Sequence, residues 1–198
     1  MDVKLRILKE AGIMFSRYGI RSITMEHIAN ELGISKRTLY EKFEDKNDLI
    51  MHVLMEANKA YKQMCSELIN NSENIIDAMF KIARIHNNTF NKINSIFFED
   101  LKKYHPEIHN KFLQKGDIRD YTLTLSLLER GVNEQIIRSD INIDIVNIFV
   151  HKMVDLSKAS EFLEVKKEDI KDSIFLPYLM GVSTDKGRKL IEKHLKNF

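Results

Sequence analysis

The chain has 198 residues, of which 43% are hydrophobic and 30% charged, a composition typical of a soluble globular protein with one large or two small domains. The formal net charge of +2 is almost neutral, so affinity for a polyanion would depend on where the charges lie and not on their sum. A single cysteine, Cys65, excludes an internal disulfide, and the lack of a signal peptide or a membrane-spanning apolar run predicts a cytoplasmic protein without a membrane partner.

The first predicted element is a helix from about Val3 to Tyr18, whose apolar side chains recur at helical spacing. Gly19 is expected to end this helix. Two prolines and seven glycines are few for this length, which favours long helices over many strands. We therefore predict an all-α fold, in which this helix packs across the next two.

The stretch 24–43 predicts two short helices joined by a tight turn. Thr24 is a good N-cap for the first helix, and Gly33 follows its apolar run, where a positive φ is needed to end a helix. Ser35 is the N-cap candidate for the second helix. The small Ala29, a glycine four residues later and an aliphatic residue ten later form the packing pattern of a helix-turn-helix.

Two cations, Lys36 and Arg37, occupy the first turn of the second helix. The helix dipole disfavours each of them there by roughly 0.3–1 kcal/mol. A DNA backbone reverses that penalty, because phosphates attract both cations and free backbone N–H groups. A solvated charged pair on a surface helix is the alternative for these residues alone. Combined with the caps, the glycine and the apolar spacing, the pair predicts DNA binding.

This pattern resembles the DNA-binding domain of the TetR family of transcriptional regulators. The matching residues are Thr24, Ile28-Ala29, Gly33, Ser35, Leu39-Tyr40, Phe43, Lys46 and Asp48-Leu49. The resemblance implies an all-α protein with an N-terminal three-helix DNA-binding domain, residues 1–61, followed by a helical ligand-binding and dimerisation domain, residues 62–198. In that second part the similarity is limited to length, helical character and element order.

The candidate DNA contacts lie in and around the second helix. Arg37 is suited to reading a guanine, because its forked guanidinium matches two acceptors on that base edge. The family often has a small residue at this position, which leaves open whether Arg37 reaches a base or only the backbone. The resemblance implies backbone contacts for Tyr40 and Lys46, although Tyr40 could instead pack half-buried. The full predicted set is Thr24, Ser35, Lys36, Arg37, Thr38, Tyr40, Lys42 and Lys46.

Helices are predicted through most of the remaining chain. A long helix at 46–69, capped by Asp45, is expected to act as a rigid lever into the second domain, and Ser72 is expected to cap the helix that follows. The other expected helices are 76–90, 94–104, one from Pro106 to Arg130 with Gly116 marking a kink or close packing and Gly131 as its stop, 145–162, 168–181 with Pro177 as a kink or an interruption, and 184–196.

A ligand pocket is expected in the second domain, where aromatic residues fall in the helices in which the family builds its pocket. The predicted lining residues are His86, Asn87, Phe90, Phe97, Tyr104 and Tyr121. For each aromatic taken singly, an ordinary core position is the stronger alternative. His105 and His109 have the spacing of a metal pair, but Pro106 between them argues against a regular two-histidine face, so no metal and no cofactor are expected.

Two strongly apolar stretches, 145–162 and 170–180, are richer in apolar residues than one small domain needs. The family resemblance implies that such helices from two subunits form a four-helix dimer interface; the alternative is that they complete the core of one chain. The predicted interface residues are Ile145, Phe149, Met153, Leu156 and Ile174. A two-fold dimer would read both halves of a palindrome.

We therefore predict a sequence-specific DNA-binding transcriptional regulator, a ligand-responsive repressor that binds a palindromic operator as a homodimer. Its expected partners are double-stranded DNA, an unidentified small-molecule effector and a second copy of the chain. The alternative is a helical carrier or sensor of hydrophobic molecules without DNA binding. An enzyme is not expected, because the sequence contains no Gly-rich phosphate loop, nucleophile elbow or HExxH motif.

Overall fold

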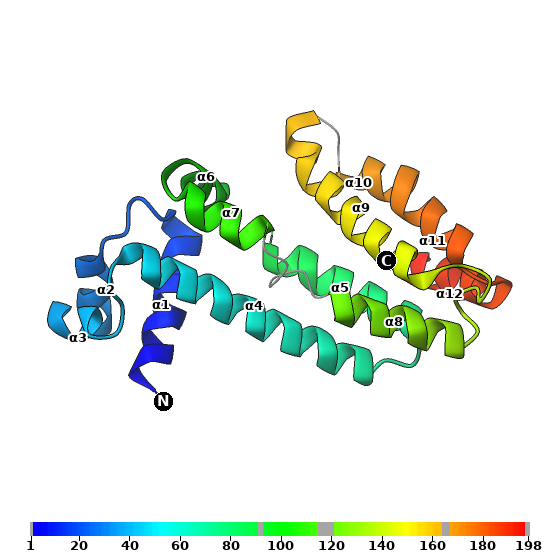
Figure 1. Cartoon of the computed structure of the whole chain (residues 1–198), viewed down its shortest axis with the longest axis horizontal. Coiled ribbons are helices and arrows are strands. Elements are labelled where there is room, and N and C mark those ends of the chain that lie inside the picture. Colours follow the sequence, from blue (N-terminus) through cyan, green and yellow to red (C-terminus); the bar gives the residue numbers. More distant parts are fainter. Residues whose placement is uncertain (1, 91–92, 115–120, 164–166, 197–198) are drawn as a thin grey trace. The chain divides into compact units, whose positions relative to one another are not determined.

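The computed structural model describes residues 2–90, 93–114, 121–163 and 167–196, excluding the side chains of residues 86, 87, 89, 90, 112–114, 154–163, 167 and 168. All regular elements in these ranges are helices, as expected from the sequence (Figure 1). They form two compact units. We call Met1–Met64 with Arg84–Ile118 the N-terminal unit, and Cys65–Ala83 with Arg119–Phe198 the C-terminal unit. The predicted domain division after residue 61 stays a prediction.

The N-terminal unit is built around a short bundle of helices. Its first four helices are α1 (Val3–Tyr18), α2 (Met25–Leu32), α3 (Lys36–Tyr40) and the first part of α4 (Lys46–Asn70). Their shared core includes Phe15, Ile28, Leu39 and Phe43, all almost completely buried. The predicted first helix is confirmed in both bounds, and Gly19 ends it with a φ of +80°.

Two further helices, α6 (Ser95–Tyr104) and α7 (Pro106–Gln114), belong to the same unit. The link between α1 and α2 is bonded to α6, because Asp100 Oδ2 accepts the Arg21 backbone N–H at 2.7 Å. The Asn94 N–H, just before α6, donates to the Ser16 carbonyl at 2.9 Å. Buried apolar side chains of α6, including Phe97, complete the core of this unit. These bonds attach α6 to α1 and to the link that leads into the helix-turn-helix.

The C-terminal unit contains the end of α4, the first part of α5 and the remaining helices. Its elements are α5 (Ile75–Phe90), α8 (Tyr121–Asn133), α9 (Ile143–Leu163), α10 (Lys167–Ile170), the π-helical turn η1 (Lys171–Phe175), α11 (Leu176–Val182) and α12 (Asp185–Leu195). Aliphatic side chains dominate its core, among them Ile75, Ile76, Ile136, Ile137 and Ile191. None of the described helices, in either unit, combines the length and the apolar character needed to cross a bilayer.

Two expectations about helix ends in the C-terminal unit were wrong. Ser72 does not cap α5; its hydroxyl donates to the Leu68 carbonyl, and Asn74 caps the helix by accepting the Asp77 N–H at 3.0 Å. Gly131 does not stop α8, which continues to Asn133. A methyl group at Gly131 would lie 2.6 Å from side-chain atoms of Ile75 and Ile137, so this glycine allows close packing instead.

The regular α-helix expected in this region is interrupted next to Pro177. The π-helical turn η1 directly precedes α11, and Pro177 is the second residue of α11, so the change in helical hydrogen bonding occurs where the proline lacks an N–H. Gly181 was expected to end the helix, but α11 extends to Val182. The helix expected from Pro106 to Arg130 appears as α7 and α8, and the predicted kink at Gly116 lies outside the described residues.

Candidate nucleic-acid interface

The helix-turn-helix begins with a reciprocal cap at Thr24. Its hydroxyl accepts the His27 N–H at 3.1 Å, while the Thr24 N–H donates to the His27 ring nitrogen Nδ1 at 3.5 Å. At the other end of α2, Gly33 adopts a φ of +63°, in the left-handed region that L-residues seldom occupy. The turn that follows therefore needs only a few residues, and it leads directly to the cap of α3.

The second helix, α3, is short and capped by Ser35, whose hydroxyl accepts the Thr38 N–H at 3.0 Å. The helix ends at Tyr40, earlier than predicted, and Phe43 follows in the turn before α4. The Phe43 ring is buried and lies edge-on to His52 of α4, with ring centroids 5.5 Å apart. Phe43 thus fixes the end of α3 against the core instead of extending the helix.

Both cations of the α3 first turn are exposed, and each is paired with a carboxylate. Lys36 Nζ lies 2.8 Å from Glu26 Oε1 of α2. The side chain of Arg37 is 89% exposed, and its Nε donates to Glu41 Oε1 at 3.0 Å. The hydrogen bond and the charge of Lys36 lower the pKa of Glu26, so that this pair persists to lower pH than an isolated carboxylate would allow. Ion pairs at the surface are weak, so a phosphate can displace either carboxylate.

The polar groups of three further predicted DNA-contact residues differ in how accessible they are to a phosphate; the residues are Tyr40, Lys42 and Lys46. Tyr40 is about half exposed, and Lys42 is exposed. The ammonium group of Lys46 instead donates to the Ile20 carbonyl at 2.6 Å, and burial lowers its pKa. Lys46 therefore already has a structural role at the start of α4, where its charge stabilises the link between α1 and α2.

The structure brings Ser35, Lys36, Arg37 and Thr38 together at the start of α3, with Tyr40 at its end. The carboxylate partners were not identified from the sequence. The Arg37–Glu41 pair has helical i,i+4 spacing and could have been read from it. The Lys36–Glu26 pair joins two helices and requires the folded arrangement. Together these residues form a small exposed surface. Its two cations are each paired with a carboxylate in the protein without DNA.

We expect Glu26→Gln to strengthen DNA binding, because the substitution releases Lys36 for a phosphate. The slope of log K against log salt should become steeper by up to about 0.9, the value for one additional phosphate contact. Fluorescence anisotropy of a labelled duplex, titrated from low to moderate salt, measures this slope. Glu31→Gln, also exposed on α2, is the matched control. Unchanged affinity and slope in Glu26→Gln would show that Glu26 does not compete with a phosphate for Lys36.

The six predicted pocket residues are not gathered in one unit. Phe97 is buried in the core of the N-terminal unit, and Tyr104 of that unit is exposed, with its hydroxyl accepting from Arg21 at 2.8 Å. Tyr121 belongs to the C-terminal unit, where its ring packs on His151. The side chains of His86, Asn87 and Phe90 lie outside the described residues.

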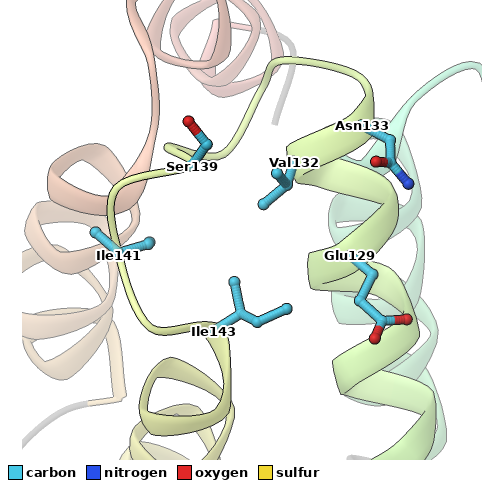
Figure 2. A pocket seen from close by; sticks show the side chains of 6 residues that line it. All are labelled: Glu129, Val132, Asn133, Ser139, Ile141 and Ile143. Atoms are coloured by element: carbon cyan, nitrogen blue, oxygen red, sulfur yellow. The ribbon is translucent and has the colours of Figure 1, made fainter.

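The C-terminal unit contains a hollow of about 390 Å³ where α8 ends and the chain turns towards α9 (Figure 2). Figure 2 shows Val132, Ile141 and Ile143 directed towards it, with Glu129 and Asn133 on the α8 side. The hollow is open to solvent. Within the described part of the chain, no group of three or more His, Cys, Asp or Glu side chains is arranged to hold a metal ion.

The predicted interface residues of the C-terminal unit differ in exposure. Ile145 is 64% exposed and Phe149 is also exposed, although the Phe149 ring contacts Tyr178 of α11, with centroids 4.8 Å apart. Met153 is buried and Ile174 partly so. The side chain of Leu156 lies outside the described residues. The first turns of α9 therefore present apolar side chains to solvent in the single chain.

Comparison with known proteins gives a match at the N-terminus. Residues 7–53 match the family model of bacterial regulatory proteins, tetR family. The HTH-type transcriptional regulator SAB2452 of Staphylococcus aureus (strain bovine RF122 / ET3-1) is 45% identical over 54 residues, which are 27% of this chain and 29% of that relative. The match thus spans less than a third of the relative's length.

Solved structures share the fold over most of the chain. A transcriptional regulator from Cytophaga hutchinsonii superposes with a TM-score of 0.70 at 18% identity, covering 92% of this chain and 100% of that one. A TetR-family regulator from Marinobacter aquaeolei VT8 gives 0.65 at 18% identity, covering 100% and 98%. A gamma-butyrolactone receptor (ArpA like protein) gives 0.62 at 17% identity, covering 95% and 92%.

At these identities the structural likeness concerns the fold alone. The family match, however, includes the reciprocal cap of α2, the left-handed Gly33 and all of α3. The helical fold of the whole chain is also similar to that of a solved TetR-family regulator. Residues 7–53 of the chain therefore carry the helix-turn-helix DNA-binding domain of bacterial regulatory proteins of the tetR family.

Proposed function

We propose that the protein is a ligand-responsive repressor that binds a palindromic operator as a homodimer. One observation carries the DNA-binding part of this proposal: a capped short helix, α3, presents Lys36 and Arg37 to solvent, with the partly exposed Thr38 beside them, while Leu39 is buried in the core. Cations in the first turn of a helix oppose its dipole, and phosphates compensate for that cost. A carrier without DNA binding would have no use for this arrangement.

In the proposed complex α3 enters the major groove and its residues divide into two roles. Arg37, once released by Glu41, reads a guanine through two parallel hydrogen bonds. Tyr40 and the hydroxyl of Thr24 bond phosphates and so fix the register of α3 on the duplex. Lys46 stabilises the fold beneath and adds positive charge close to the same backbone.

The DNA-binding proposal is tested by footprinting on the DNA upstream of the protein's own gene. We expect a protected site at moderate salt and about 5- to 150-fold weaker binding by Arg37→Ala, since one bidentate base contact contributes about 1–3 kcal/mol. Tyr40→Phe should weaken binding less and equally on all sequences. Arg17→Ala, which removes an exposed arginine of α1, is the control. If Arg37→Ala and Arg17→Ala weaken binding equally, Arg37 reads no base.

The dimer is proposed to form through α9 and α11. This proposal is supported by the exposure of Ile145, Ile148 and Phe149 on the first turns of α9, since contiguous exposed apolar side chains are typical of interfaces. Dimerisation also has a mechanistic reason, because one α3 contacts only a few base pairs. Two copies related by a two-fold axis would contact two half-sites.

We expect Ile145→Asp to shift the protein from dimer to monomer, because it buries an unpaired carboxylate in the proposed apolar interface. Light scattering coupled to size-exclusion chromatography measures the mass of the species. Ile13→Asp is the matched control, because Ile13 is a similarly exposed isoleucine on α1 of the N-terminal unit. A monomeric wild-type protein, or a dimeric Ile145→Asp variant, would contradict the proposed interface.

The response to a ligand is proposed to run through α4, which contributes residues to both units. A ligand can change DNA affinity only if it binds the DNA-competent and the incompetent states with different affinities. The fold is shared with a gamma-butyrolactone receptor, which is consistent with a small-molecule effector. The proposed effect of the ligand is a changed separation of the two α3 helices in the dimer.

A further inference from the structure

The C-terminal unit contains a buried side-chain amide, that of Asn147, between α8 and α9. Its nitrogen is hydrogen-bonded, whereas its oxygen has no partner among the described residues. Asn147 of α9 is only 5% exposed. Its Nδ2 donates to the backbone carbonyl of Tyr121 at 2.9 Å. Its Oδ1 is also buried, and no hydrogen-bond partner for it exists in the described part of the chain. A buried amide oxygen without a donor is costly, so its presence requires an explanation.

The hydrogen bond from Asn147 Nδ2 to the Tyr121 carbonyl identifies the unsatisfied atom as the amide oxygen. The Tyr121 carbonyl can only accept a hydrogen bond, so the amide nitrogen of Asn147 must face it. The amide oxygen therefore has to face away from that carbonyl. The group that would complete this site must be a hydrogen-bond donor, such as a hydroxyl or an N–H.

The neighbours of Asn147 add aromatic surface to this acceptor. His151 lies one turn further along α9, at the i,i+4 spacing that places two side chains on the same face. Its ring packs on the Tyr121 ring, with centroids 4.1 Å apart. Small-molecule sites in proteins are mostly apolar, with a few placed polar groups that fix the orientation of the ligand. Here the packed rings of Tyr121 and His151 supply aromatic surface, and Asn147 supplies a polar group.

We propose that Asn147, with Tyr121 and His151, forms the polar end of the effector site, and that the effector is a small, largely apolar molecule bearing a hydroxyl or N–H donor. The inference rests on the proposed ligand response and names the chemistry of its site. The open hollow near Asn133 is a different place and is not part of this site. An ordered water would satisfy the same amide oxygen, so the test has to separate a ligand site from a hydrated one.

Phenol and toluene are suitable probes, because they match in size and differ by one hydroxyl donor. Affinities of both for the purified full-length protein, measured by NMR titration, give a phenol-to-toluene ratio. We expect this ratio to fall about tenfold in Asn147→Leu, which removes the acceptor, given the cost of an unsatisfied buried group. Asn133→Leu, at the open hollow, should leave the ratio within about twofold of wild type, since surface substitutions have small effects.

A second measurement keeps the test independent of how well Asn147→Leu folds. In the wild-type protein, phenol should give nuclear Overhauser contacts to the ring hydrogens of Tyr121 and His151. Equal ratios in wild type and Asn147→Leu, absence of phenol binding, or a loss of preference in Asn133→Leu would each overturn the inference. These outcomes are separable from failure of the proposed function, because a protein that binds no DNA can still show the Asn147-dependent preference.

Discussion

Phe43→Ala is expected to lower the free energy of unfolding of the N-terminal unit by about 3–5 kcal/mol, the usual cost of emptying a buried phenylalanine site. Phe43 is 1% exposed and belongs to the hydrophobic core of the unit. Its ring lies edge-on to His52 of α4, and the ammonium group of Lys4 of α1 lies 5.4 Å from its centroid. Because Phe43 also follows α3 directly, its loss should leave α3 poorly positioned. Urea unfolding measures the stability change.

The matched control for this prediction is Phe98→Ala in α6, where the residue is 44% exposed and its neighbour Phe97 occupies the core. We expect that variant to cost no more than about 1 kcal/mol, as is usual for a surface site. DNA affinity, measured under conditions in which Phe43→Ala is still folded, should fall more than in Phe98→Ala. Equal unfolding costs for the two variants would mean that Phe43 does not hold α3 in place.

Arg130→Met is the second large effect, with an expected loss of about 2–3 kcal/mol, because Arg130 bonds three groups at once. Its guanidinium donates to the carbonyls of Ile69 and Ser72, at the end of α4 and in the turn that follows, and to the Glu134 carboxylate at 2.6 Å. The same carboxylate accepts the Ile75 N–H, at the start of α5, at 3.0 Å. Arg130 and Glu134 of the α8 region therefore fix the corner between α4 and α5.

Thermal unfolding of Arg130→Met, compared with Arg17→Met at an exposed arginine, checks this prediction. The double variant Arg130→Met with Glu134→Gln should cost less than the sum of the single variants, since the partners share one network. Additive costs would show that the two residues act separately. If the proposed ligand response runs through α4, a loosened α4–α5 corner should also weaken the effect of a ligand on DNA binding.

The N-terminal helices were predictable because their signals are local. Thr24 and Ser35 cap their own helices, Gly33 takes the left-handed conformation, and Asn94 caps α6 within two residues. At Gly131, where the prediction was wrong, one of the deciding contacts is distant in the chain. Gly131 continues its helix because Ile75 and Ile137 pack against it, and no pattern around residue 131 reveals that packing.

The sequence predicted the cations and the tyrosine of the candidate DNA interface. It did not predict the two carboxylates, Glu26 and Glu41, that pair with the cations. Lys36 and Arg37 stand out by their place in a first helical turn, whereas Glu26 becomes relevant only when α2 and α3 pack together. The same holds for Lys46, whose bond to the Ile20 carbonyl joins positions 26 residues apart. Asn147 was not identified as a site residue, because an unsatisfied amide can be recognised only from its neighbours.

Selection of binding sites from a random pool of DNA duplexes tests the central claim most directly, because it needs no knowledge of the target gene. The proposed function predicts an enriched inverted repeat, with half-site centres about 34–36 Å apart or a multiple of that spacing. Arg37→Ala should relax the preference at one position in each half-site while leaving the spacing intact. Recovery of unrelated sequences by the wild-type protein at moderate salt would contradict the account, because α3 would then contact the backbone without reading bases.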